Sequence, residues 1–170
     1  MEGSGLRSQG QGAYLHIQLG KQLLSLVEDD KVLFQAPIST AENGPGEQRD
    51  SGCTPRGWHC IRAKIGAGQL ENTVFVGRRP SGEIYSQELA QEHPLRDWIL
   101  TRILWLSGLE RGINRLGSVD SMQRYIYIHG TPDSEPMGVP KSHGCIRMRN
   151  KDIIRLFEMV PAYIRVLIEE

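Results

Sequence analysis

The chain has 170 residues, which suits a single domain able to bury roughly two-thirds of its unfolded surface. Twenty lysines and arginines balance twenty aspartates and glutamates, so the formal net charge is zero. Because a neutral chain has no overall field to attract a polyanion, we expect no nucleic-acid partner. No apolar run approaches the ~20 residues that a membrane-spanning helix needs, so we expect no membrane span.

The beginning of the chain and the cysteines bear on the cellular compartment. The first residues, MEGSGLRSQGQGAYLHI, lack the basic and then apolar profile of a secretory signal. We expect a cytoplasmic protein if Met1 is the native start, and a periplasmic protein if an export signal was removed. Cys53, Cys60 and Cys145 cannot all pair with one another, so at least one thiol is predicted to be free. Cys53 and Cys60 are expected to be small buried hydrophobic residues.

Strand patterns dominate the first half of the chain. A lead over residues 1–13 is rich in Gly, Ser and Gln, and we expect it to be flexible. Short runs of apolar and β-branched residues, separated by turn residues, then predict β-strands at 14–19, 22–27, 31–39, 59–65 and 72–77.

The middle of the chain has a different pattern. Apolar side chains recur there at helical spacing, namely Leu95, Ile99, Ile103 and Leu106. Turn residues and charge follow them, so we predict a helical insertion over residues 89–123 that could form a lid. Trp98 and Trp105 lie in this block, and core packing is favoured for both over a role in the lid.

The strand pattern returns in RYIYIHG, residues 124–130. Period-two alternation places Tyr125, Tyr127 and His129 on one face of this strand, with His129 at its end. Tyr127 could therefore line a pocket together with His129, although half-buried packing is the more common role of a strand tyrosine.

The end of the chain predicts one helix and one strand. Asn150 is expected to cap a helix that Pro161 ends, and YIRVLIE, residues 163–169, reads as a closing strand. The whole pattern predicts a mainly β fold with short helices, in one domain over residues 14–170.

A serine, a histidine, a glycine and a cysteine stand side by side in KSHGCIRMRN, residues 141–150. A thiol of pKa near ~8.5 is mostly protonated at neutral pH, so a nucleophilic cysteine needs an imidazole or amide dipoles close by. Cys145 has two candidate partners, His143 just before it and His129 at the strand end. We favour His129 as the base, because side chains diverge in a tight turn that contains glycine.

The loop from Gly130 to Gly144 holds three prolines, which restrict its path. Gly144 would let the chain turn sharply before Cys145 and bring backbone N–H groups toward a reacting carbonyl oxygen. The turn is therefore a candidate oxyanion hole.

A metal site is the first alternative. His129, His143 and Cys145, joined by His59 or Cys60, are residue types that zinc accepts. The chain has no paired C-x-x-C or H-x-x-x-H pattern among them, so we expect neither a metal nor another cofactor.

Arginines near the cysteine could bind substrate. Arg147 and Arg149 could each grip a substrate carboxylate in bidentate fashion, or could form surface ion pairs with Asp152 or Glu158. We favour Arg147 for the ligand. Together with Tyr127 and Gly130, Arg147 completes the set of candidate substrate-binding residues.

The motifs IHGT and SHGCIRM together resemble the signature of the L,D-transpeptidase catalytic-domain family, in which a strand-end histidine precedes a Ser-His-Gly-Cys turn. TPRGWHCIRAKIG, residues 54–66, is similar to a second family element, Thr-Pro-x-Gly-x-x-x-Ile. The resemblance runs roughly from Tyr14 to the end, and residues 89–123 resemble the insertion of a small Gram-negative branch. It implies an L,D-transpeptidase-like β-sandwich with a helical insertion.

The resemblance also implies roles for single residues. Cys145 would be the nucleophile and His129 the base that deprotonates it. His143 and Gly144 would shape the turn whose backbone serves the oxyanion, and Ser142 would orient the site through hydrogen bonds. Many family members have Asn where this chain has Arg147, which leaves the handling of the acceptor open.

The implied substrate is the L,D peptide bond that joins diaminopimelate to D-alanine in peptidoglycan stem peptides. Attack by the thiolate would release D-alanine and leave a thioester. Water would then give an L,D-carboxypeptidase of muropeptide recycling, and an amine of another stem would give a cross-linking L,D-transpeptidase. Carbapenems are expected to acylate the same thiol. The rival hypothesis is a catalytically silent module that only binds stem peptides.

Overall fold

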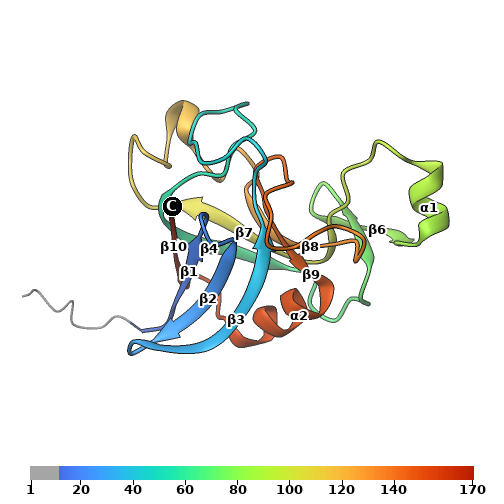
Figure 1. The fold of residues 1–170 in the computed structure, drawn as a ribbon, viewed down its shortest axis with the longest axis horizontal. Coiled ribbons are helices and arrows are strands. Elements are labelled where there is room, and N and C mark those ends of the chain that lie inside the picture. Colours follow the sequence, from blue (N-terminus) through green and yellow to red (C-terminus); the bar gives the residue numbers. More distant parts are fainter. Residues whose placement is uncertain (1–11) are drawn as a thin grey trace, which may run out of the picture.

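The computed structural model describes residues 12–170, which form ten β-strands and two α-helices (Figure 1). The prediction of a flexible lead concerns residues that lie, apart from 12 and 13, outside the described part. The strands are β1 (Tyr14–Gln18), β2 (Leu23–Glu28), β3 (Lys31–Ser39), β4 (Gly57–Ile65), β5 (Thr73–Val76), β6 (Arg79–Ile84), β7 (Leu100–Gly108), β8 (Tyr127–Thr131), β9 (Ile146–Arg149) and β10 (Arg165–Glu169). The helices are α1 (Gln87–Glu92), α2 (Asn150–Met159) and a short 3-10 turn, Gly117–Val119.

The strands form one sheet that closes on itself. Their order is β4-β10-β1-β2-β3-β9-β8-β7-β5-β6, and an additional pairing of β4 with β7 joins the ends of the first eight. Strands β5 and β6 extend from β7 as a hairpin, and the chain through α1 continues this projection on one side of the molecule (Figure 1). The prediction of a mainly β fold with short helices is confirmed.

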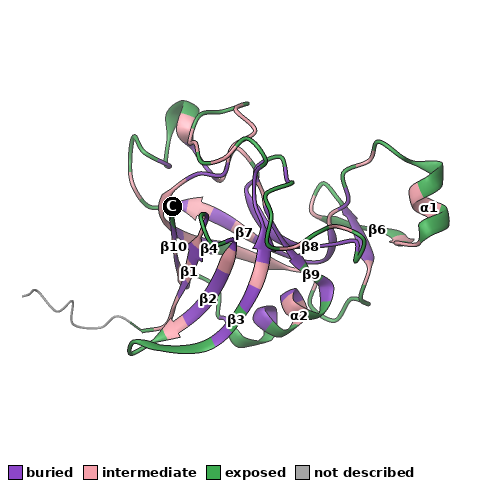
Figure 2. Cartoon of the chain, in the orientation of Figure 1, coloured by how far each residue is buried: buried purple, intermediate pink, exposed green. Residues whose placement is uncertain are grey.

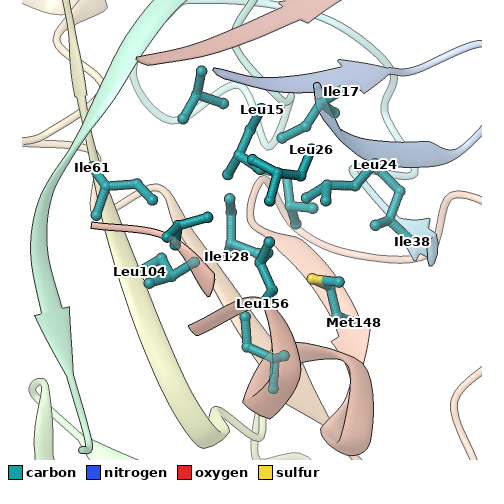
Figure 3. Packing of buried hydrophobic residues seen from close by; sticks show 14 of the residues in the cluster. Leu15, Ile17, Leu24, Leu26, Ile38, Ile61, Leu104, Ile128, Met148 and Leu156 are labelled. Atoms are coloured by element: carbon teal, nitrogen blue, oxygen red, sulfur yellow. The ribbon is translucent and has the colours of Figure 1, made fainter. Parts of the chain in front are cut away.

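The hydrophobic core lies inside this closed sheet. Along β1, Leu15 and Ile17 are fully buried while their neighbours are only partly covered, as period-two alternation requires (Figure 2). Side chains from opposite walls and from α2 point toward one another in the interior, among them Leu24, Leu26, Ile38, Ile61, Leu104, Ile128, Met148 and Leu156 (Figure 3). Burial of each such side chain contributes about 1.5–3 kcal/mol, so the core fixes the strands that carry the site.

The predicted helical insertion over residues 89–123 is wrong in its secondary structure. Strand β7 occupies its centre, and α-helix is found only in α1, which ends at Glu92. The physical reason is burial: nearly every residue of β7 is covered, so its apolar side chains need not alternate and can also fit helical spacing. Trp105 therefore lies in a strand, and Trp98 is buried in the segment before β7 beside Tyr85.

The predicted cap of α2 is also wrong, although the helix is where the sequence places it. The capping position is Arg149, and its side chain makes no capping bond. The Asn150 side chain instead accepts a hydrogen bond from Thr101 Oγ1 (2.6 Å) and donates one to Asn72 Oδ1 (3.0 Å), so it ties α2 to the sheet. Neither helix of the described residues is long and apolar enough to span a bilayer.

Candidate active site

Two parallel strands position the candidate nucleophile and base. The register of β8 and β9 pairs Ile128 with Ile146 and His129 with Arg147, and Cys145 directly precedes β9. Because paired residues share a face and residues two apart point the same way, His129, Cys145 and Arg147 project from one side of the sheet. The two isoleucines point into the core on the other side, where both are fully buried. The site is therefore built on the outer face of the core strands.

Six of the eight predicted site residues line one small cavity of about 80 Å³. They are Cys145, His129, Ser142, His143, Gly144 and Arg147, and the cavity is completed by Asp97, Arg124, Tyr125 and Ile126. Tyr127 and Gly130 are not among its lining residues. His129 is the central residue of β8 and not its end as predicted, and the chain brings it and the cysteine turn to the same cavity across the long loop between them.

The sulfur of Cys145 is held by backbone groups of the neighbouring chain. The Tyr127 N–H donates to Sγ (3.4 Å), and the thiol donates to the carbonyl oxygen of Tyr125 (3.4 Å). Tyr125 has a φ of 56°, a left-handed conformation that costs a non-glycine residue free energy and that is enriched at functional sites. Burial raises the pKa of the Cys145 thiol to about 11, so the thiol is protonated at neutral pH when no substrate is bound.

His129 is almost fully buried, and its tautomer follows from its neighbour. Its Nδ1 lies 2.6 Å from the carbonyl oxygen of Gly130, which can only accept, so Nδ1 carries the proton. The lone pair of Nε2 is then left to accept another proton. Burial lowers the pKa of His129, which keeps the imidazole neutral at neutral pH. The two groups that line the cavity are therefore a neutral thiol and a neutral imidazole.

Ser142 and Thr54 brace the turn before the cysteine. The Ser142 hydroxyl donates to the carbonyl oxygen of Cys145 (2.6 Å) and accepts from the Gly144 N–H (3.3 Å). Thr54 Oγ1 donates to the carbonyl oxygen of Gly144 (2.9 Å) and accepts from the Ala41 N–H (3.0 Å). Sequence reasoning gave Thr54 no role, although it begins the TPRG motif.

Gly144 has the backbone conformation that its prediction requires. Its φ is 138°, in a region that residues with a side chain rarely adopt, and an added Cβ would lie 3.3 Å from the Cys53 carbonyl oxygen. Its N–H is occupied by the Ser142 hydroxyl in this state. The backbone therefore turns at Gly144 in a conformation that suits glycine. The Gly144 N–H would have to release the Ser142 hydroxyl before it could donate to an oxyanion.

Arg147 is engaged inside the protein. Its guanidinium contacts Asp97 Oδ1 (3.1 Å) and Glu135 Oε2 (3.6 Å), and it donates to the carbonyl oxygen of Lys141 (3.3 Å). The alternative pairing with Asp152 or Glu158 is wrong, because the carboxylates that reach it come from the α1–β7 segment and the long loop. His143, by contrast, is exposed and lies 3.9 Å from Asp97 Oδ2.

Gly130 and Tyr127 support the site from outside the cavity. A side chain at Gly130 would collide with Asn150 Oδ1 and lie 2.7 Å from the carbonyl oxygen of Leu100, so glycine is required for close packing. The Tyr127 side chain is buried, and its hydroxyl accepts a hydrogen bond from Arg78 Nη1 (3.1 Å). Sequence reasoning did not consider Arg78, which lies in a turn with no motif around it.

Among residues 12–170, no three His, Cys, Asp or Glu side chains come together in a way that could hold a metal ion, so the structure gives the zinc alternative no support. His59 is fully buried elsewhere, with Nε2 bonded to Ser121 Oγ (2.8 Å) and Nδ1 to the Gly57 carbonyl oxygen (3.0 Å). All three cysteines are free, and Cys53 and Cys60 are partly exposed, which differs from the expected full burial.

Two larger grooves flank the small cavity. One, of about 360 Å³, is lined by residues of the α1–β7 segment and the long loop, including Trp98, Pro132 and Lys141. The other, of about 270 Å³, is lined by Arg49, Asp50, Gly52 and Gln123. His143 lines both grooves and the small cavity. Cys145 lines the small cavity alone, and His143 is the lining residue that this cavity shares with both grooves.

The fold and the cavity together define a β-sheet protein with a cysteine–histidine site. Within that class the chain belongs to the YkuD family, the L,D-transpeptidase catalytic domain, whose family model matches residues 12–168. The predicted resemblance is thereby confirmed.

Similar proteins agree with this assignment. The putative L,D-transpeptidase YqjB of Bacillus subtilis (strain 168) is 46% identical over 43 residues, which are 25% of this chain and 24% of that protein. The structural match with the L,D-transpeptidase from Xylanimonas cellulosilytica covers 95% of this chain and 62% of that chain, at 22% identity and a TM-score of 0.52. Against L,D-transpeptidase 3 from Mycobacterium tuberculosis in complex with a faropenem-derived adduct, the coverage is 95% and 61%, the identity 15% and the TM-score 0.57.

This chain thus spans about a quarter of the curated relative and about 60% of the two solved chains. At these identities the solved structures establish the fold, and they confirm the predicted L,D-transpeptidase-like β architecture.

Proposed function

We propose that this protein is a cysteine acyl-transfer enzyme that acts on the L,D peptide bond between diaminopimelate and D-alanine in peptidoglycan stem peptides. The observation that carries the proposal is that Cys145 and His129 project from one face of adjacent parallel strands and line the same cavity. Membership of the L,D-transpeptidase catalytic-domain family supports the choice of bond.

In the first half of the reaction, Nε2 of His129 takes the proton of the thiol as the sulfur attacks the carbonyl carbon. The tetrahedral intermediate then collapses, the C–N bond breaks, and the imidazolium returns the proton to the leaving amine of D-alanine. A thioester on Cys145 remains. Because the thiol is protonated at rest, proton transfer has to accompany substrate binding or attack rather than precede it.

The second half depends on the nucleophile that meets the thioester. Water gives a tripeptide and makes the protein an L,D-carboxypeptidase, and an amine of a second stem gives a cross-link and makes it an L,D-transpeptidase. The two grooves beside the cavity support an arrangement in which one holds the donor stem and the other admits the acceptor.

Incubation with a synthetic tetrapeptide, alone and with an excess of a D-amino acid as amine acceptor, tests the proposal. Mass spectrometry should show tripeptide without the acceptor and, for a transpeptidase, a coupled product with it. The Cys145→Ala protein serves as the control and should give neither. If the folded wild-type protein binds the tetrapeptide but releases no D-alanine, the silent binding module is the better description.

A carbapenem provides a second test, because the L,D-transpeptidase LdtMt1 was solved in complex with imipenem. We expect one equivalent of a carbapenem to add its mass to this chain, on the peptide that contains Cys145. The Cys145→Ala protein, which retains Cys53 and Cys60, should stay unmodified. An adduct on either of those two thiols would contradict the assignment of the nucleophile.

A further inference from the structure

A cluster of aromatic and cationic side chains lies next to the cysteine and shares Tyr125 with the lining of the small cavity. The guanidinium of Arg78, in the turn between β5 and β6, stands 4.6 Å from the ring centre of Trp105 and 5.0 Å from that of Tyr125. Its Nη1 donates to the Tyr127 hydroxyl (3.1 Å). Two rings and a phenol therefore fix the position and orientation of one guanidinium group.

This guanidinium reaches the nucleophile through two separate residues. Tyr127 contacts Arg78 with its hydroxyl and Cys145 Sγ with its N–H (3.4 Å). Tyr125 contacts Arg78 with its ring and Sγ with its carbonyl oxygen (3.4 Å). Each of the two routes passes through a single residue, so we infer that Arg78 is close enough to the attacking atom to bind a group of the same substrate.

Arg78 also differs from Arg147, one of the two arginines that line the cavity with Cys145. Arg147 is paired with Asp97 and Glu135, whereas no carboxylate among residues 12–170 forms an ion pair with Arg78. Arg78 is only partly covered, and the bond to Tyr127 uses one of its five N–H donors. Because the Tyr127 hydroxyl accepts from Arg78, its own proton remains to be donated to an anion.

We propose that Arg78 and the Tyr127 hydroxyl form a carboxylate-binding site that holds the substrate peptide beside Cys145. The inference rests on the proposed function, and it moves the carboxylate contact from Arg147 to Arg78. A planar guanidinium with free N–H groups matches the two oxygens of a carboxylate, and charge-assisted hydrogen bonds of this kind are the strong ones.

The proposed substrate offers two carboxylates of this chemistry near the scissile bond. One is the C-terminal carboxylate of the leaving D-alanine, and the other is the carboxylate on the D-centre of diaminopimelate. A tetrapeptide with a C-terminal amide lacks the first, and a tetrapeptide with lysine at the third position lacks the second.

Calorimetric binding to the Cys145→Ala protein tests the site without turnover. The parent tetrapeptide and both analogues are titrated into this protein, and into the same protein with Arg78→Gln or with Arg79→Gln. Arg79 is the matched control, because it is an exposed arginine at the neighbouring position. We expect Arg78→Gln to raise the Kd for the parent peptide about 10- to 100-fold, and Arg79→Gln to change it less than twofold.

The analogues identify which carboxylate is bound. The peptide that lacks the bound carboxylate should bind the protein with Arg78 intact as weakly as the parent peptide binds the Arg78→Gln protein. Its Kd should not rise further when Arg78 is replaced by Gln. Equal affinity of the Arg78 and Arg78→Gln proteins for the parent peptide, or no measurable binding at millimolar concentration, would overturn the site. Binding that depends on Arg78 without tetrapeptide turnover by the wild-type protein would instead overturn the proposed function and leave the carboxylate site standing.

Discussion

His129 and Cys145 lie on one face of adjacent parallel strands, and burial shifts their pKa values in opposite directions. The pKa of the imidazole falls and that of the thiol rises, and both shifts favour the uncharged form. The site at rest is therefore a neutral pair and not the thiolate–imidazolium ion pair that activates some cysteine enzymes. Four predictions follow from this arrangement and from the packing that holds it.

Replacement of Cys145 by alanine should abolish turnover and leave the protein folded. Cys145 is partly exposed, and its sulfur makes only two weak hydrogen bonds, so little stability depends on it. We expect a nearly unchanged Tm by calorimetry. Cys60→Ala, at a partly exposed thiol remote from the cavity, should keep full activity, and turnover by the Cys145→Ala protein would place the nucleophile elsewhere.

Replacement of His129 by alanine should lower kcat by roughly two to four powers of ten, the usual range for loss of a general base. The substitution also leaves a cavity under the sheet face, so the Tm should be measured alongside. His143→Ala separates the two histidines, because His143 is exposed and bonded only weakly to Asp97. If His143→Ala costs more than His129→Ala, the assignment of the base is reversed.

The pKa shifts predict the pH dependence of the site. The base works in its unprotonated form, and burial holds the pKa of His129 below 6.5, so the acid limb of kcat/KM should lie below pH 6.5. The thiolate fraction rises about tenfold per pH unit below the thiol pKa of about 11. Alkylation of Cys145 by iodoacetamide should therefore keep accelerating from pH 7 to pH 10. A plateau near pH 8 would show a thiol of ordinary pKa.

Replacement of Gly130 by alanine should destabilise the protein by about 1–3 kcal/mol or more, because the new methyl group meets the Leu100 backbone and Asn150. Urea unfolding measures the loss. Activity should fall as well, since the Gly130 carbonyl sets the tautomer of His129. Gly12→Ala, where an added Cβ meets nothing within 4 Å, is the matched control and should be neutral. Equal stability of the two variants would contradict the packing argument.

The sequence by itself predicted the first strands and the C-terminal helix, and it indicated the chemistry that we propose for the turn. Alternation along residues 14–18 follows from which side chains face the core, so this strand could be predicted. In β8 the core lies on one face and the candidate site on the other, and all five residues are buried. The order Ser142, His143, Gly144, Cys145 indicated a nucleophile in a tight turn, because each residue acts there through its own backbone or through a near neighbour.

Where an answer depended on partners far along the chain, only the tertiary structure decided it. The apolar side chains of residues 99–106 fit helical spacing, and residues 100–108 form a strand because β4 and β8 pair with its two edges. Arg147 is neutralised by Asp97, fifty residues away, whereas Arg78, beside Tyr127, forms no ion pair with any carboxylate of residues 12–170. Pairing of charges and closure of a sheet are set by distances in space, which the spacing of residues along a chain does not contain.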